Sequence, residues 1–134
     1  MTIVIDASAA VAVALAMPGS DAFQPLLEQA DMVIAPELYI AEVCNAFWKY
    51  RKADLLAADQ CEQALENALG LADQLEPALD LHREAFALAV RHLHPMYDAL
   101  YLVLARRHNA TLLTLDRRMA ELARKLEIEV VIPG

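Results

Sequence analysis

The run Thr2-Ile3-Val4-Ile5-Asp6 is short, apolar and rich in β-branched residues, and it ends in a carboxylate. An uninterrupted run of this kind is typical of a strand that is buried on both faces of a sheet. Asp6 and Ser8 then offer oxygens that can cap a helix over residues 9–16, which Pro18 and Gly19 end. A strand that leads straight into a helix is the beginning of a βαβ unit.

The same alternation continues along the chain. Further strands are expected at short apolar runs, namely 32–34, 78–81, 111–115 and 129–132. Helices are expected over 21–29, 37–52, 57–75, 83–92, 97–108 and 117–126. The alternation predicts an α/β fold: one domain over residues 1–134, built as a three-layer parallel sheet with helices on both faces.

Composition limits the class of protein. The chain has 134 residues, of which 58% are hydrophobic, and this is ample for one core. The longest uncharged apolar stretch, residues 7–17, is too short to span a bilayer, and no basic leader precedes an apolar core. We therefore expect a cytoplasmic protein with no membrane partner. Cys44 and Cys61 lack metal-ligand spacing and are expected to be free, buried thiols.

The net charge of -8 argues against a protein that coats nucleic acid. It does not exclude a nuclease, because a bound metal ion would cancel part of the charge of an acidic pocket. It also suggests that a basic partner could bind.

Four acidic residues stand out by position: Asp6, Glu42, Asp98 and Asp116. Each has an ordinary explanation, since Asp6, Asp98 and Asp116 can cap helices and Glu42 can be a solvated helix residue. Yet Asp6 and Asp116 both end apolar runs, and ligands of parallel sheets bind at the carboxyl ends of strands. Carboxylates gathered there indicate Mg²⁺ or Mn²⁺ chemistry, and hence phosphodiesters.

Four sequence motifs together resemble the PIN-domain ribonucleases, specifically the VapC-type toxins of bacterial toxin–antitoxin pairs. Each motif is weak alone, but their order and intervals match almost from end to end. They are Val4-Ile5-Asp6-Ala7-Ser8, Ala41-Glu42-Val43-Cys44-Asn45-Ala46, Tyr97-Asp98-Ala99-Leu100-Tyr101 and Leu113-Thr114-Leu115-Asp116-Arg117-Arg118.

The resemblance implies a PIN-like sheet with the first strand central, and an acidic pocket made of the four carboxylates. Asp6 and Asp98 would bind the metal directly, while Glu42 and Asp116 would hold metal-bound waters or a second ion. Asp116 is thus also counted among the metal-holding residues. Mg²⁺ is the expected cofactor, with Mn²⁺ as the alternative.

Four further residues are candidates for binding substrate. Ser8 and Thr114 match small hydroxyl positions that line the pocket in the family. Asn45 should share a helix face with Glu42, or be an ordinary surface amide. Arg117 could reach a substrate phosphate, or be a solvated residue of a first helical turn.

The implied function is that of the toxin of a type II toxin–antitoxin pair: a Mg²⁺-dependent endoribonuclease. The implied partners are an RNA substrate, a cognate antitoxin and a second copy of the chain. The alternatives are a catalytically weak PIN-like module that binds RNA or protein, and a phospho-receiver signalling domain. The second lacks its acidic pair, its central acceptor and a late Lys near Thr114. His92 and His94 are expected at the surface.

Overall fold

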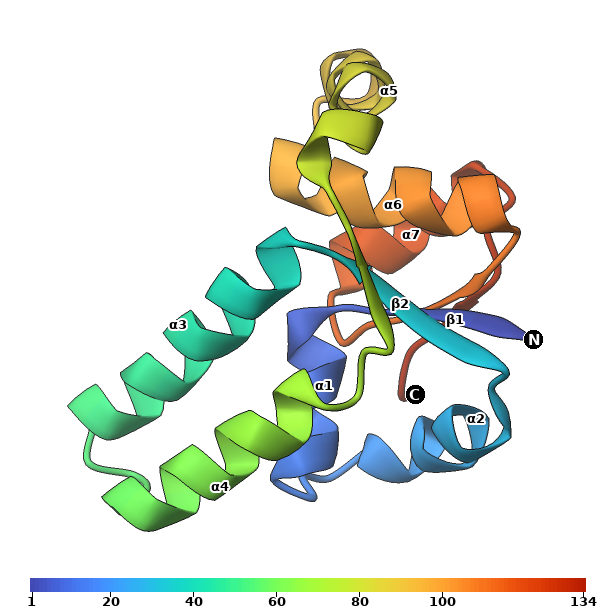
Figure 1. Ribbon diagram of the computed structural model, residues 1–134. Helices are drawn as coiled ribbons and strands as arrows, with labels where there is room; N and C mark the ends of the chain where they lie inside the picture. Colours follow the sequence, from blue (N-terminus) through green and yellow to red (C-terminus); the bar gives the residue numbers. More distant parts are fainter.

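The computed structural model describes residues 1–134 as a five-stranded parallel sheet between helical layers (Figure 1). The strands lie in the order β3-β2-β1-β4-β5, and every neighbouring pair is parallel. The predicted three-layer α/β fold is confirmed, with the first strand at its centre. The elements are β1 (Thr2–Ile5), α1 (Ala7–Ala14), η1 (Ser20–Ala22), α2 (Gln24–Gln29), β2 (Met32–Pro36), α3 (Leu38–Lys52), α4 (Ala58–Leu69), β3 (Gln74–Glu76), α5 (Ala78–His92), α6 (Met96–His108), β4 (Thr111–Leu113), α7 (Arg117–Lys125) and β5 (Val130–Val131).

The register of the two central strands fixes what meets at the carboxyl edge of the sheet. Ile5 of β1 pairs with Leu113 of β4, and the backbone N–H of Asp6 donates to the carbonyl oxygen of Leu113 at 3.2 Å. Asp6 and Thr114 therefore leave their strands side by side. Because Ile5 and Leu113 are fully buried, this alignment is locked into the hydrophobic core.

Helices cover the two faces of the sheet unequally. On one face α6 contacts β1, β2 and β4, with α5 outside it and α7 beside it. On the other face lies α1, which is packed by α3 and α4. Figure 1 shows α3 and α4 running side by side and projecting from the sheet as an arm. The carboxyl edge of the sheet opens where α1, α3, α6 and α7 begin.

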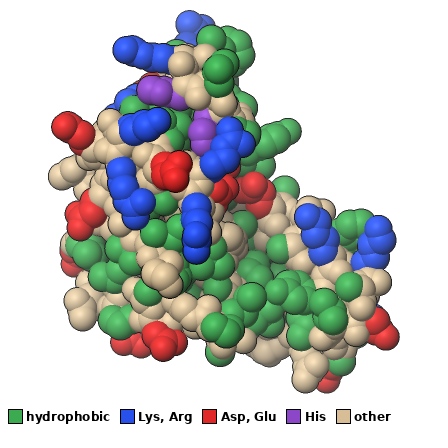
Figure 2. Space-filling view, turned by 180° about the vertical axis from the view of Figure 1, so that it is seen from behind, with side chains coloured by type: hydrophobic (Ala, Val, Ile, Leu, Met, Phe, Trp, Pro, Cys, Tyr) green, Lys and Arg blue, Asp and Glu red, His purple; other side chains and the backbone are tan.

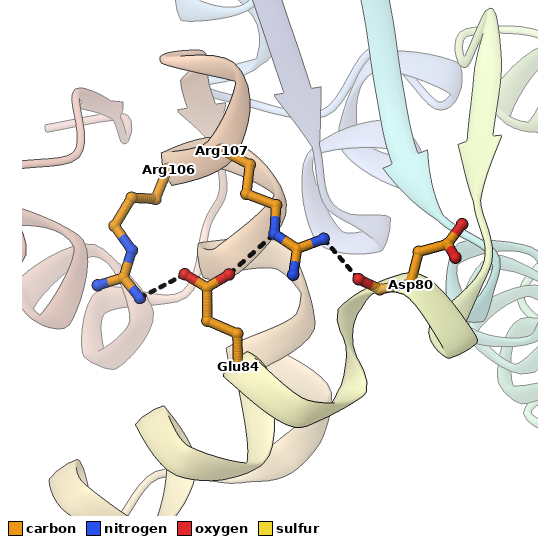
Figure 3. A network of polar contacts seen from close by, with 4 residues as sticks. All are labelled: Asp80, Glu84, Arg106 and Arg107. Carbon is orange, nitrogen blue, oxygen red and sulfur yellow. Dashed lines mark hydrogen bonds and ion pairs between the residues drawn. The ribbon is translucent and has the colours of Figure 1, made fainter.

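A polar network fastens α5 to α6 (Figure 3). Glu84 of α5 accepts from Arg106 Nη2 and Arg107 Nε, each at 2.8 Å. Arg107 Nη1 also donates to the backbone carbonyl oxygen of Asp80 at 2.5 Å. One carboxylate thus accepts hydrogen bonds from two guanidinium groups, and these bonds hold α5 against α6 near the solvent.

The third strand differs from the sequence-based prediction. It was expected at 78–81 and lies at Gln74–Glu76, whereas residue 78 begins α5. Gln74 and Glu76 are polar residues on an edge strand, so no apolar run marks it. Pro77 precedes the first helical residue, where its fixed φ suits a helix start. The helix expected through 75 ends at Leu69, before Gly70.

Two expectations from composition can be compared with the structure. Both cysteines are free thiols, with Cys61 buried and Cys44 half-buried. None of the helices has the length and apolar character needed to cross a membrane.

Candidate functional site

Asp6 is the centre of the site, and its carboxylate is held by three hydrogen bonds. It follows β1 and is 5% exposed. One oxygen, Oδ1, accepts from Ser8 Oγ at 2.7 Å and from the Ala9 N–H at 2.9 Å. The other, Oδ2, accepts from Thr114 Oγ1 at 2.5 Å. Asp6 is therefore the N-cap of α1 and a fixed carboxylate at the sheet edge at the same time.

Burial dominates the electrostatics of this carboxylate. It raises the pKa of Asp6 to about 6, although the hydrogen bonds from Thr114, Ala9 and Ser8 oppose the shift. The negative charge of Glu42 raises this pKa further. A buried carboxylate of this kind gains from any cation that replaces its lost hydration.

Ser8 and Thr114 also tie the end of β4 to the site. Ser8 Oγ accepts from the Leu115 N–H at 3.0 Å, and Thr114 Oγ1 accepts from the Asp116 N–H at 2.9 Å. Asp116 in turn accepts from the Met119 N–H at 3.1 Å and is the N-cap of α7. The two small hydroxyls therefore set the position of both Asp6 and Asp116.

Glu42 is positioned from α3 by a tyrosine of another helix. Tyr101 Oη, on α6, donates to Glu42 Oε1 at 2.7 Å. Burial raises the pKa of Glu42, the hydrogen bond from Tyr101 lowers it, and the charge of Asp98 raises it. The pKa of Tyr101 itself is raised by burial and by Glu42, so its hydroxyl stays a donor.

Asp98 lies in the first turn of α6, half-buried, beside His94. The Nδ1 atom of His94 lies 3.3 Å from Asp98 Oδ2. Burial and the charge of Asp116 raise the pKa of Asp98, while His94 and Arg118 lower it. Contrary to the expectation of a surface position, the His94 side chain is only 7% exposed, and neither of its ring nitrogens has a hydrogen-bond partner.

The four predicted carboxylates thus lie at one edge, and Glu42, Asp98 and Asp116 each raise the pKa of another carboxylate. The electrostatic contacts run from Asp6 to Glu42, from Glu42 to Asp98, and from Asp98 to Asp116. Such a set of hard oxygen donors fits a divalent cation, because the ion would relieve their mutual repulsion. It is not a preassembled cage, since no group of three or more His, Cys, Asp and Glu side chains is arranged around one point.

A groove of about 460 Å³ leads from these carboxylates along α1 and α3. Ser8, Glu42 and Asn45 lie in its wall, so Asn45 does share a face with Glu42. The rest of the wall is mainly apolar, with Lys49 at one side. Figure 2 shows this face of the molecule, with acidic side chains near its centre and a broad hydrophobic surface below them.

Two of the four substrate candidates do not line the groove: Thr114, which is fully buried, and Arg117. Arg117 lines a different hollow, together with Arg124 and the carboxyl-terminal residues 132–134. Its neighbour Arg118 lies close enough to Asp98 to lower the pKa of that carboxyl. The two consecutive arginines therefore lie on different faces of α7.

Two residues of the site were missed by the sequence reasoning. Tyr101 lies three residues after Asp98, a spacing that places both on one side of a helix, but an apolar helix offers core packing as the default explanation for tyrosine. His94 precedes Pro95 in a loop, and nothing in its local sequence indicates burial.

Comparison with known proteins gives a consistent family. The chain matches the PIN domain model over residues 3–125. It is 35% identical to Ribonuclease VapC3 of Pyrobaculum aerophilum over 127 residues, which cover 90% of this chain and 94% of the relative. The crystal structure of PAE2754 from the same organism superposes with a TM-score of 0.66 at 30% identity, covering 90% of this chain and 86% of that one.

Two more distant structures share the fold. VapBC2 from Rickettsia felis, solved with a DNA fragment from their promoter, has a TM-score of 0.70 at 16% identity, and both chains are covered in full. VapC20 of Mycobacterium tuberculosis, described as a Sarcin-Ricin loop cleaving toxin, has a TM-score of 0.65 at 16% identity, covering 90% of this chain and 94% of that one. The family match, the identity to VapC3 and the shared architecture agree, and the chain belongs to the PIN-domain family, among its VapC-type ribonucleases.

Proposed function

We propose that this protein is a Mg²⁺-dependent endoribonuclease and the toxin of a type II toxin–antitoxin pair. The observation that carries the proposal is the chain of electrostatic contacts linking Asp6, Glu42, Asp98 and Asp116 at the carboxyl edge of a parallel sheet. The identity to a protein named Ribonuclease VapC3 supports RNA as the substrate. Mn²⁺ is the alternative ion.

In this proposal Asp6, Asp98 and Asp116 hold the metal, and Glu42 holds a water bound to it. A bound Mg²⁺ would make a water more acidic and offset charge on the phosphate. The protein contributes orientation. Ser8 and Thr114 fix the carboxylate of Asp6, and Tyr101 fixes that of Glu42. Water attack in line with the 3′ oxygen would leave 5′-phosphate and 3′-hydroxyl ends.

Substrate would enter along the groove beside the carboxylates. Asn45 and Lys49 lie in its wall and could contact the sugar–phosphate backbone. Ser8 stays a candidate for substrate contact, whereas Thr114 is fully buried and acts through Asp6 and the backbone of Asp116. The prediction for Arg117 also stays a prediction, and it would require RNA to reach the hollow on the far side of α7.

The antitoxin would use the same groove. Its apolar wall suits the apolar face of a partner segment, and the carboxylates at its end suit an arginine on that segment. Such binding would cover Glu42 and exclude RNA. The net charge of -8 is compatible with a basic partner segment.

A second copy of the chain is also proposed as a partner. Leu79, Phe86, Val90 and Leu93 of α5 and its C-cap are exposed by 80%, 64%, 59% and 85%. Their spacing places them along one side of the helix. Large apolar side chains gathered in this way are typical of surfaces that subunit interfaces bury.

The decisive experiment is cleavage of total cellular RNA by purified, partner-free protein, with Mg²⁺, with Mn²⁺ and with chelator. Asp98→Asn keeps the size of the side chain and removes its charge, so we expect near-total loss of cleavage with an unchanged melting temperature. Asp59→Asn is the matched control, because Asp59 is exposed in the first turn of α4. Cleavage that persists in Asp98→Asn would refute the assignment.

One observation favours a second candidate, a catalytically weak module that binds RNA or protein. No three metal-binding side chains are arranged around one point. Calorimetry separates the two candidates: a nuclease binds Mg²⁺ through Asp6 and Asp98, whereas the binding module takes up no ion and leaves RNA intact under every condition above.

A further inference from the structure

We propose that a basic channel on the α5 and α7 side of Asp98 binds the phosphate backbone of single-stranded RNA next to the scissile bond. The proposal rests on the proposed ribonuclease function and adds a subsite to it. The channel is formed by His92, His94, Arg118 and Lys125, and it continues to Arg91 and Arg106.

The channel consists of two adjoining hollows. The first, of about 200 Å³, is lined by His92, His94, Arg118 and Lys125 with Glu121. The second, of about 440 Å³, shares His92 and Lys125 with it and adds Arg91, Arg106 and Glu84. Since His94 contacts Asp98, the path begins at the carboxylates and leads away from the groove on α3. Figure 2 shows Lys, Arg and His side chains gathered beside the central acidic ones.

The spacing on α7 directs its charges into this channel. Arg118, Glu121 and Lys125 are separated by three and four residues, so they lie on one face of the helix. Arg117 and Arg124 lie on another face and line the hollow near the carboxyl terminus. The helix thus divides its four cations between two surfaces, and one of these surfaces adjoins the site.

Most of the positive charge in the channel is uncommitted. Arg106 is neutralised by Glu84, as Figure 3 shows. The remaining ion pairs join Met1 to Asp31, His94 to Asp98 and Arg107 to Glu84. No ion pair therefore involves Arg91, Arg118 or Lys125. In a chain with a net charge of -8, a path with three free cations is a local exception.

His94 shows that the channel is more than a set of helix-end cations. Arg91 and Lys125 lie in last helical turns, where cations complement the helix dipole, and this alone would explain their residue types. It does not explain His94, whose side chain is 7% exposed and lines the channel: its Nδ1 contacts Asp98 Oδ2 at 3.3 Å, while its buried Nε2 has no hydrogen-bond partner. A buried polar group without a partner costs stability, and an anionic phosphate oxygen would supply the acceptor.

The position suits a polynucleotide more than an isolated ion. The channel begins at Asp98 and extends past Arg118, Lys125 and Arg91, so successive phosphates of one strand could follow it. Contacts of this kind hold the backbone without reading sequence. RNA held there would place its neighbouring phosphodiester at the carboxylates.

The test is a pair of charge-matched double variants, Arg91→Gln with Lys125→Gln, and Lys52→Gln with Arg83→Gln. Both pairs remove two exposed cations, but only the first pair lines the channel, and the second pair lies outside the groove and the hollow near Arg117 as well. The probe is a short fluorescein-labelled oligouridylate, and its Kd is measured by anisotropy in chelator at several salt concentrations. KM and kcat for metal-dependent cleavage of total RNA are measured in parallel.

We expect the first pair to raise Kd and KM by about tenfold at low salt, with little change in kcat. The slope of log Kd against log salt should also fall by about 1.4, since each lost phosphate contact removes roughly 0.7 for a single strand. The control pair should behave as the wild type. If the two double variants change Kd and KM equally, or not at all, while the wild type cleaves RNA, the channel proposal is wrong and the proposed function stands. A wild type that neither binds nor cleaves RNA would overturn the proposed function as well.

Discussion

Thr114 Oγ1 donates a hydrogen bond to Asp6 Oδ2 at 2.5 Å and accepts one from the Asp116 N–H at 2.9 Å. One buried hydroxyl therefore connects the carboxylate of Asp6 to the backbone of Asp116, 110 positions later in the sequence. It gives the carboxylate that follows β1 a hydrogen-bond donor, and it fixes the position of the backbone where α7 begins. This dual contact makes Thr114 the position where stability and activity should be most tightly coupled.

Replacing Thr114 by valine should impair both properties. The substitution keeps the shape of the side chain but removes a donor to Asp6 and an acceptor for the Asp116 N–H. We expect a loss of about 1–3 kcal/mol in the free energy of unfolding. The pKa of Asp6 should rise further, which moves the acid limb of the pH–rate profile to higher pH. Urea unfolding and rates of RNA cleavage measure the two effects. Thr114→Ser retains the hydroxyl and should restore most of both, and equal damage by the serine variant would contradict the role of the hydroxyl.

The raised pKa of Asp6 predicts an unusual pH dependence of stability in chelator. Its folded-state value of about 6 exceeds the ordinary value of 3.8, so the folded protein binds a proton there that the unfolded chain has released. The contribution of Asp6 to stability is therefore fully present below about pH 4 and is lost as the pH rises toward 6. The loss amounts to about 3 kcal/mol.

The control for this pH dependence is Asp6→Asn, which cannot titrate. The difference in free energy of unfolding between wild type and variant should change across that interval, in favour of the wild type at the acid end. Activity should follow the opposite course, because an ionised Asp6 is needed to hold a cation. A difference that stays constant with pH would mean that Asp6 titrates normally.

Removing the Tyr101 hydroxyl should weaken the binding of Mg²⁺ with little effect on the fold. Tyr101→Phe leaves Glu42 without its donor, and the loss of an outer partner of a metal-binding group typically costs 10–100-fold in metal affinity or activity. Calorimetry with Mg²⁺ and the metal dependence of cleavage test this prediction. Tyr97→Phe serves as the control, since Tyr97 is exposed by 61% on the same helix. If the two variants bind Mg²⁺ with equal affinity, Tyr101 has no role in positioning Glu42 for metal binding.

A charge placed on the exposed face of α5 should prevent self-association. Phe86 is 64% exposed in the monomer, so Phe86→Glu should leave the melting temperature nearly unchanged. Sedimentation equilibrium should show a dimer for the wild type and a monomer for the variant. Gln63→Glu, at an exposed position of α4, adds the same charge away from this face and should leave the dimer intact. A monomeric wild type, or a variant that still dimerises, would contradict the use of this face.

The sequence was sufficient to predict that carboxylates at strand ends lie together at one edge of the sheet. Asp6 and Asp116 each close an apolar run, and in a parallel sheet such positions meet at one edge whenever their strands are neighbours. Their role as helix caps and their place in the site turned out to be compatible, since both carboxylates accept from the first turn of a helix.

The sequence was insufficient where a contact joins elements that are distant along the chain. The bond from Tyr101 to Glu42 spans 59 positions, and tyrosine in an apolar helix has no local signature for it. The burial of His94 depends on α7 packing against the loop before α6. The prediction for the edge strand β3 was wrong for a related reason. Gln74 and Glu76 form a strand because they pair with β2, and their own sequence has no apolar pattern that indicates one.

The hydrogen bond across 108 positions has a consequence for synthesis on the ribosome. A nascent chain that has emerged as far as Lys52 already carries Asp6 and Glu42, yet its Asp6 lacks Thr114 and the neighbouring strand β4. The acidic edge can be completed only after Asp116 has left the exit tunnel. Products of translation that stop before this residue therefore lack the site, however well their amino-terminal helices fold.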